Sequence, residues 1–219
     1  VIDIRDVALG DLPPLGQRDY EAFIATGSID FDWQLPQDEW QALTLSYTSG
    51  TSGRPKGVVY HHRGSYLMSF GTVAAWQLGQ HPTYLYTVPM FHCNGWGHAW
   101  TTALMAATIV LTRTITAEEI FRLVETHTVT HFGGAPIVLG MLVNADETLR
   151  PDLSDRTVKV MTAGAPPPAS ILEKLSAMGF EVMQVYGLTE TYGHVTQCVW
   201  REEWDDLPFS EKAEMQSRQ

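Results

Sequence analysis

The feature that most constrains the fold is an alternation that begins at Ala42. Short runs rich in β-branched and aromatic residues are separated by longer amphipathic runs. Strands joined by crossover helices give this pattern, so the chain is predicted to be an α/β protein with layered sheets. The expected strands cover 43–47, 83–88, 108–111, 129–132, 158–162 and 181–186, and the expected helices cover 62–76, 117–126, 136–144 and 168–178.

The last of these helices has a clear apolar periodicity. Its apolar residues recur at three- and four-residue spacing and are expected to line one buried face. They are Ile171, Leu172, Leu175 and Met178. The start of the chain is different, because residues 1–41 are rich in Asp, Pro and Gly and show no sustained period. We expect a surface lead-in segment of loops with one short helix there, followed by a folded part over 42–219.

Composition limits the partners. The chain has 219 residues, of which 44% are hydrophobic, and this is enough for the core of one ordinary domain. It carries 14 basic and 25 acidic residues, a formal net charge of −11, and no run of Lys or Arg that could follow a phosphate backbone. Nucleic acid is therefore not an expected partner. An acidic protein that binds an anion must supply the favourable field locally, through backbone N–H groups, a placed lysine or a metal ion.

Two further features indicate the cellular setting. Cys93 and Cys198 form no CxxC pair, so a zinc site or a redox dithiol is not predicted and a cytoplasmic protein is the default expectation. The longest apolar stretch lies within 101–111 and is too short to cross a bilayer, and no basic and apolar leader is visible. Neither a membrane span nor a targeting segment is expected.

The most informative stretch is the glycine-rich segment 47–57, YTSGTSGRPKG, which follows a predicted strand. Glycines let consecutive N–H groups turn inward around anionic oxygens, hydroxyls add donors, and Lys56 supplies a positive charge. Two residues separate Gly50 from Gly53, whereas the P-loop of NTPases has four, so that motif is absent. An ordinary surface turn is the alternative, since Gly, Ser, Thr and Pro are common in turns.

This segment resembles the phosphate-binding loop of the adenylate-forming (AMP-binding) superfamily, which includes acyl-CoA synthetases, firefly luciferases and the adenylation domains of peptide synthetases. The resemblance implies that the loop binds the phosphates of ATP and that Lys56 is catalytic. The implied phosphate-binding residues are Thr48, Ser49, Gly50, Thr51, Ser52, Gly53 and Lys56.

A second segment, 186–191, reads YGLTET and is similar to the family's YGxTE motif. The resemblance implies that Tyr186 packs on adenine with Gly187 beside it, that Thr189 bonds the α-phosphate, and that Glu190 ligates Mg²⁺. One carboxylate is chemically sufficient, because Mg²⁺ takes its other ligands from phosphates and water. The alternative for this segment alone is a glycine turn with a solvated glutamate.

Between these motifs, Gly164, Ala165 and Pro166 follow a predicted strand. The resemblance makes this segment the shelf for adenine, where small residues let a flat base lie against the backbone. It also reads as a helix start with proline in the first turn, and the two interpretations are compatible.

Segment 89–96, PMFHCNGW, resembles the family's aromatic motif. Adenylation domains that take amino acids usually carry an aspartate after the phenylalanine, whereas this chain has His92, which cannot pair with an α-ammonium group. A simple carboxylic acid is therefore the expected substrate, with His92 near the carboxylate. The implied acid pocket comprises His92, Trp96, Gly133, Gly134 and Gly187. A buried histidine with satisfied hydrogen bonds and a tryptophan in the core are the alternatives, and the spacing of His92, Cys93 and His98 fits no zinc pattern.

Segments 18–21, 59–64, 90–96 and 134–138 are similar to the acyl-CoA synthetase branch for short- and medium-chain acids and 3-(methylthio)propionate. The resemblance implies an ATP-dependent ligase that uses ATP, Mg²⁺ and coenzyme A. Family members are longer, so we expect 42–219 to be the central part of the AMP-binding domain, without the domain that carries a catalytic lysine, and to have little activity alone. An aryl-acid or luciferase-like adenylating enzyme, a non-catalytic nucleotide-binding module and a homodimeric assembly remain open.

Overall fold

The computed structural model describes residues 1–219 apart from 7, 9, 50–52 and 219. Contacts divide the chain into two units, Val1–Gln37 and Asp38–Gln219. In the first unit, β1 (Ile2–Asp3) pairs in parallel with β2 (Arg18–Asp19), and α1 (Tyr20–Ile24) follows. Asp19 caps α1 by accepting from the backbone N–H of Ala22, and this is the one short helix that the sequence predicts.

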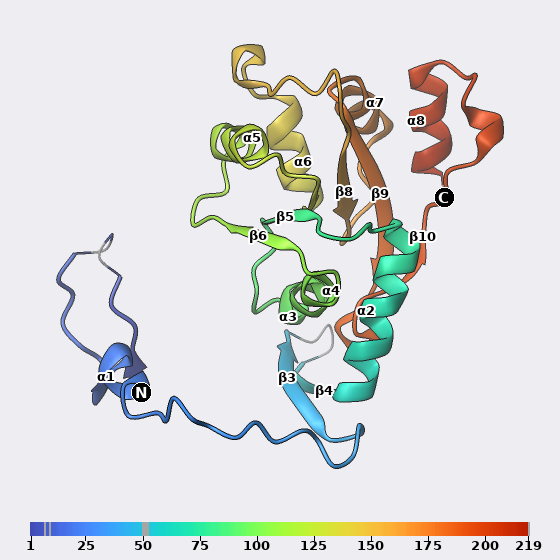
Figure 1. Cartoon of the computed structure of the whole chain (residues 1–219). Coiled ribbons are helices and arrows are strands. Elements are labelled where there is room, and N and C mark those ends of the chain that lie inside the picture. Colours follow the sequence, from blue (N-terminus) through green and yellow to red (C-terminus); the bar gives the residue numbers. More distant parts are fainter. Residues whose placement is uncertain (7, 9, 50–52, 219) are drawn as a thin grey trace. The chain divides into compact units, whose positions relative to one another are not determined.

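The second unit is built on a six-stranded sheet in the order β10-β9-β8-β7-β5-β6 (Figure 1). All pairs are parallel except β9 with β10, and this confirms the predicted α/β class. The strands are β5 (Thr83–Tyr86), β6 (Thr108–Leu111), β7 (His131–Gly133), β8 (Val158–Thr162), β9 (Phe180–Gly187) and β10 (His194–Gln197). The edge strand β10 was not predicted, because its four residues alternate weakly and it forms only by pairing with β9.

A separate antiparallel hairpin joins β3 (Ala42–Thr48) to β4 (Lys56–His61). The sequence predicts β3 but not β4, because β4 begins inside the glycine-rich segment, where turn signals dominate. Thr48 and Lys56 are cross-strand partners, so the described residues Ser49 and Gly53 lie where the two strands of this hairpin meet.

Four predicted helices are present with ends within two residues of expectation. They are α2 (His62–Trp76), α5 (Ala117–Thr126), α6 (Pro136–Val143) and α7 (Ala169–Ala177). Three others were not predicted: α3 (Cys93–Trp96), α4 (His98–Leu104) and α8 (Phe209–Ser217). The first two are too short for a helical period to stand out. Short 3₁₀ turns lie at η2 (Glu147–Leu149), η3 (Thr189–Thr191) and η4 (Glu202–Trp204).

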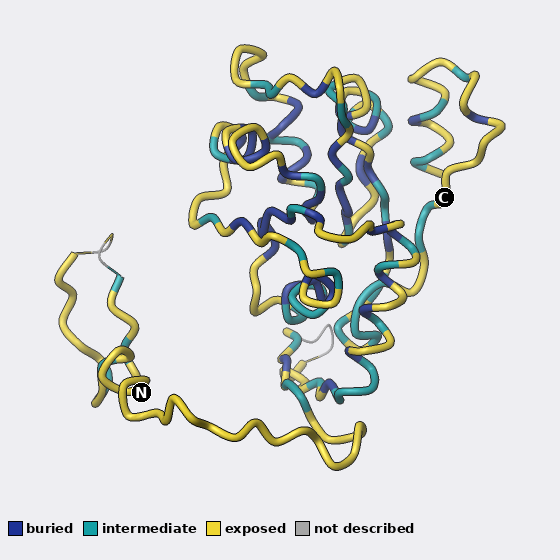
Figure 2. The backbone as a smooth tube through the Cα atoms, viewed as in Figure 1, coloured by how far each residue is buried: buried dark blue, intermediate teal, exposed yellow. Residues whose placement is uncertain are grey.

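The sheet has two unlike faces, because neighbouring residues of a strand point to opposite sides. On one face Leu85, Phe132 and Val160 pack with apolar residues of α5, α6 and α7. Figure 2 shows the buried parts of the chain, in dark blue, gathered along the strands of this sheet. The predicted face of α7 is confirmed, with Leu172 and Leu175 buried and with Ile171 and Met178 packed against the same core. On the other face, a smaller cluster joins Trp76 of α2 to Tyr84, Tyr86, Met161 and Val185.

None of the described helices combines the length and the apolar character that a membrane span requires.

Candidate functional site

The candidate site lies at the carboxyl edge of the parallel strands. The segments that follow β5, β8 and β9 meet there, which is where open α/β sheets usually bind ligands. They surround a largely apolar cavity of ≈ 550 Å³. Its lining residues are Thr87, Val88, Pro89, His92, Cys93, Trp96, Ile115, Ala135, Val138, Met161, Ala163, Gly164, Val185, Gly187, Leu188, Thr189, Gly193 and His194.

The cavity brings together several residues that the sequence singles out from distant segments. His92 and Trp96 come from the turn after β5, Gly164 from the end of β8, and Gly187 and Thr189 from the end of β9. Ala165, Pro166 and Tyr186 are exposed beside this edge. Gly164 has φ +97° and open space where a side chain would start, so only a glycine leaves that wall flat without strain.

Gly133 and Gly134 do not line the cavity but are buried behind it. A Cβ on Gly133 would lie 2.9 Å from Val88 Cγ2 and 3.4 Å from an atom of the Trp96 ring. Val88 and Trp96, which do line the cavity, therefore cover Gly133. The sequence predicts that Gly133 and Gly134 themselves form the wall of the acid pocket. In the structure, Val88 and Trp96, which pack over Gly133, form that wall.

The hairpin of β3 and β4 presents the exposed residues Ser49, Gly53 and Lys56 at its tip, and Thr48 is half-buried. Gly53 has φ +138°, a conformation that favours glycine. The predicted phosphate contacts Gly50, Thr51 and Ser52 lie outside the described residues.

Thr189 and Glu190 lie in the 3₁₀ turn η3, directly after β9. The Tyr60 hydroxyl of β4 donates to the Thr189 carbonyl at 2.7 Å, and the Cys93 Sγ lies 3.0 Å from the Thr189 Oγ1. Thr189 is thus fixed to the strand that begins at Lys56 and to the turn that carries His92. Glu190, the next residue, is exposed.

Tyr192 reinforces this attachment, although the sequence gives no reason to select it. Its ring stacks on Tyr60 with centroids 4.3 Å apart, and its hydroxyl accepts from the His61 N–H at 3.1 Å. The ring fills the space where Gly64 lacks a side chain, so a Cβ at Gly64 would overlap it. Burial, the largest cause, and the nearby Cys93 and Tyr192 raise the pKa of Tyr60, which therefore stays a neutral donor.

The turn after β5 has an unusual backbone. Five consecutive residues from Cys93 to Gly97 have φ between +46° and +72°. For residues other than glycine this left-handed conformation costs roughly 1–2 kcal/mol each, so surrounding contacts must hold it. One such contact is at Asn94, whose Oδ1 accepts from the hydroxyls of Thr44 (2.6 Å) and Ser46 (3.3 Å) on β3.

Two buried histidines, His98 of α4 and His131 of β7, pack against Trp76, and the His98 ring also contacts Trp96. The Nδ1 of His98 lies 2.5 Å from the Tyr84 hydroxyl, and burial, with His194 and His131 nearby, lowers the pKa of His98 to about 3. Burial lowers the pKa of His131 to about 4, with a further contribution from Lys159. Both side chains are therefore neutral at physiological pH and form part of the packing under the cavity.

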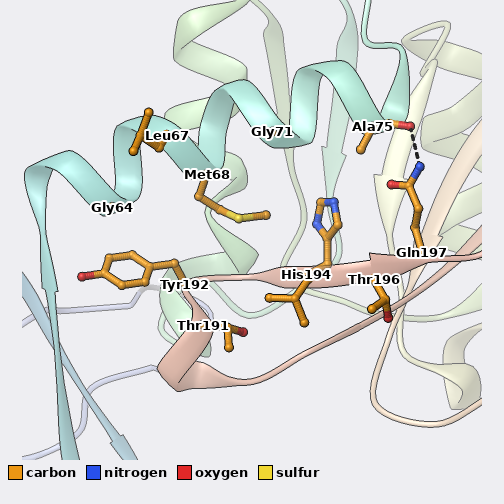
Figure 3. Close-up of a pocket in the computed structure, with 11 residues that line it drawn as sticks. Gly64, Leu67, Met68, Gly71, Ala75, Thr191, Tyr192, His194, Thr196 and Gln197 are labelled. Atoms are coloured by element: carbon orange, nitrogen blue, oxygen red, sulfur yellow. Dashed lines mark hydrogen bonds between the residues drawn. The ribbon is translucent and has the colours of Figure 1, made fainter.

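A second cavity of ≈ 460 Å³ lies between α2 and β10 (Figure 3). His194 lines both cavities, and in Figure 3 its ring rises from β10 toward α2. Gln197 Nε2 donates to the Ala75 carbonyl at 3.5 Å and closes one end. Sequence reasoning missed this cavity, because neither β10 nor its pairing to β9 was predicted.

Several acyl-CoA ligases of plants are similar in sequence to most of this chain. The acetate/butyrate–CoA ligase AAE7 of Arabidopsis thaliana is 47% identical over 206 residues, which are 93% of this chain and 36% of the relative. The acetate–CoA ligase CCL3 of Humulus lupulus is 46% identical over 93% of this chain and 36% of the relative. The 2-methylpropanoate–CoA ligase CCL4 of the same plant is 45% identical over 91% of this chain and 35% of the relative. The chain thus spans little more than a third of the length of these relatives.

Solved structures share the fold. The N-terminal domain of FACL13 from Mycobacterium tuberculosis has a TM-score of 0.70 at 27% identity, covering 77% of this chain and 42% of that chain. The o-succinylbenzoate–CoA synthetase MenE of Bacillus subtilis, in complex with ATP and magnesium ion, has a TM-score of 0.73 at 24% identity, covering 86% of this chain and 39% of that chain. The family model for the AMP-binding enzyme matches residues 11–215. With that match over most of its length and a sheet of the same architecture, the chain belongs to the AMP-binding enzyme family.

Proposed function

We propose that the protein is an ATP-dependent acyl-CoA ligase that forms an acyl-adenylate and then a CoA thioester. The observation that carries the proposal is the position of Thr189. It lines the apolar cavity and is hydrogen-bonded to Tyr60 of the strand that begins at Lys56. One residue thus connects a site for a carboxylic acid with a hairpin suited to phosphates. The names of the CoA ligases at 45–47% identity support the same reaction.

On the phosphate side, the N–H groups of the hairpin tip and Lys56 would hold the β- and γ-phosphates, and Thr189 would donate to an α-phosphate oxygen. Gly164, Ala165, Pro166 and Tyr186 would border the adenine. In an acidic chain, this concentration of donors and one lysine provides the local field that an anion requires.

The residues present fit Mg²⁺ that arrives with ATP. Glu190 is one exposed carboxylate, and no group of three or more His, Cys, Asp or Glu side chains within the described part of the chain could hold a metal by itself. An ion that takes most of its ligands from phosphates and water needs only such a residue. Bound there, Mg²⁺ would neutralise charge on the phosphate oxygens.

On the acid side, the cavity is apolar, with His92 and Trp96 in its wall. His92 offers a polar contact for the carboxylate, and the remaining surface suits an uncharged tail. Trp96, Val88 and the buried His98 fill the space beyond. We therefore propose a short- or medium-chain acid, methylthio-substituted acids included, and the relatives named for acetate, butyrate and 2-methylpropanoate support this class.

The mechanism consists of two displacements. The carboxylate oxygen attacks the α-phosphorus, the bond to the β-phosphate bridging oxygen breaks, and pyrophosphate leaves; the CoA thiolate then attacks the acyl carbon and AMP leaves. The residues of this chain contribute position and charge: His92 holds the acid, Thr189 orients the α-phosphate, and Lys56 follows the departing pyrophosphate. Coenzyme A and a cytoplasmic location are parts of this proposal, and two relatives, AAE7 among them, are named peroxisomal.

The test is ATP–pyrophosphate exchange by the full-length protein with short, medium-chain, methylthio-substituted and aromatic acids, each assayed again with CoA. Exchange with an aliphatic acid and CoA-dependent thioester formation are expected. Exchange without a thioester would favour the luciferase-like alternative, and ATP binding without exchange for any acid would favour a non-catalytic nucleotide-binding module.

A further inference from the structure

We propose that Cys93 is a positioning residue for adenylation, and that its thiol donates a hydrogen bond to Thr189 and thereby aims the Thr189 hydroxyl at the α-phosphate. The inference rests on the proposed function. It starts from the contact of 3.0 Å between the Cys93 Sγ and the Thr189 Oγ1 across 96 positions of sequence.

The direction of this hydrogen bond follows from proton counting. A threonine hydroxyl has one proton and two lone pairs, and an ionised phosphate oxygen can only accept. If Thr189 is to bond a phosphate, its single proton must point there. The contact with Cys93 must then run from the thiol S–H to the Thr189 oxygen, and this bond fixes the rotation of the hydroxyl.

The thiol is held in place from behind. Cys93 has φ +46° and begins the left-handed turn, and the next residue, Asn94, is bonded to two hydroxyls of β3. β3 is the first strand of the hairpin that would bind the phosphates. The hydrogen bonds of Asn94 therefore fix the position of Cys93 relative to that hairpin. On the opposite side, Tyr60 holds the Thr189 carbonyl at 2.7 Å. Thr189 is therefore constrained at its backbone by one strand of the hairpin and at its hydroxyl by a turn anchored to the other.

The same turn carries His92 and Trp96 in the wall of the acid cavity. A side chain that aims the α-phosphate contact is thus next in sequence to one that would contact the acid. This arrangement places the two reacting groups with a single rigid turn, which is the way that positioning lowers a barrier.

The test compares Cys93→Ala, Cys93→Ser and Cys198→Ala in the full-length protein. Cys198 is the matched control, because it is the other half-buried cysteine and lines neither cavity. We expect Cys93→Ala to lower kcat/KM for ATP about fivefold, the size of one lost hydrogen bond, with the KM for the acid changed less than twofold. Serine keeps a donor at this position and should restore most of the loss, while Cys198→Ala should have no effect.

A double-mutant cycle with Thr189→Val separates positioning from packing. If Cys93 acts through the Thr189 hydroxyl, Cys93→Ala has no further effect on kcat/KM for ATP once that hydroxyl is gone. An undiminished fivefold loss in the Thr189→Val background, or an equal loss in Cys93→Ser, would overturn the proposal.

Equilibrium binding of ATP distinguishes this inference from the proposed function. Weaker ATP binding by Cys93→Ala, restored by Cys93→Ser, supports the positioning role even if no acid supports exchange, and in that case only the ligase assignment fails. Normal exchange by the parent with unchanged ATP binding and unchanged kcat/KM in Cys93→Ala overturns the positioning role and leaves the ligase assignment standing.

Discussion

The two faces of the central sheet are built in opposite ways. The face covered by α5, α6 and α7 is filled by aliphatic residues and phenylalanine, whereas on the other face Tyr84, Tyr86 and His131 pack with Trp76 of α2 and His98 of α4. The first face is held by non-directional burial. The second is packed from aromatic rings that carry polar groups, among them the Tyr84 hydroxyl bonded to His98, and it contacts Trp96 of the candidate site. Stability and function are therefore expected to separate by face.

The largest expected effect is on the aliphatic face. Phe132 is fully buried there, and Phe132→Ala should lower the free energy of unfolding by about 3–5 kcal/mol through lost burial and a residual cavity. Denaturant unfolding of the full-length protein measures this. Ile137→Ala, on the exposed side of α6, is the control and should change stability by less than about 0.5 kcal/mol. A similar loss in both variants would show that burial of Phe132 on this face does not account for the effect.

The next effect concerns the site. Glu190→Gln should reduce pyrophosphate exchange about 100-fold, because the charge that would hold the ATP-bound Mg²⁺ is lost, and a missing unit charge at 4 Å is worth up to about 4 kcal/mol at an effective dielectric of 20. The melting temperature should stay the same, since Glu190 is exposed. Glu202→Gln, an exposed residue outside both cavities, serves as control. Unchanged exchange in Glu190→Gln would refute the assignment.

A smaller effect is expected where α2 meets the turn after β9. Gly64→Ala forces the Tyr192 ring away from Tyr60 and should cost about 1–3 kcal/mol of stability, as overpacking does. Adenylation should fall with it, because Thr189 loses its support. Gly71→Ala on the same helix meets nothing within 4 Å and should be neutral or stabilising by up to about 1 kcal/mol. Equal stability of Gly64→Ala and Gly71→Ala would show that the Tyr192 ring does not pack closely against Gly64.

The smallest effect is the pH dependence of the histidine face. The folded pKa of His98, about 3, is below the ordinary value of 6.5, so the unfolded chain binds the extra proton. Stability is therefore complete above pH 6.5 and falls as the pH drops toward 3, by about 1 kcal/mol between pH 7 and 5.5 for one such group. The melting temperature should change less with pH over this range for His98→Asn, which keeps an acceptor near Nδ1 and does not titrate. An equally steep decline in the variant would assign the pH dependence to other groups.

The sequence determined the regular part of this protein. Periodicity predicts the parallel strands and α2, α5, α6 and α7, because a segment that is buried in a sheet or against it has apolar residues at regular spacing. Glycine and proline chemistry marks the hairpin tip, and the order of the segments places Gly164, Gly187 and Thr189 at strand ends.

Tertiary structure decided the rest. The strand β10, the left-handed turn after His92 and the second cavity have no local period, since each is held by partners elsewhere in the chain. The contacts on Thr189 show this most clearly: Tyr60 is 129 positions away and Cys93 is 96 positions away. A hydrogen bond between residues so distant leaves no pattern in either segment, so only the folded chain can bring its two atoms together.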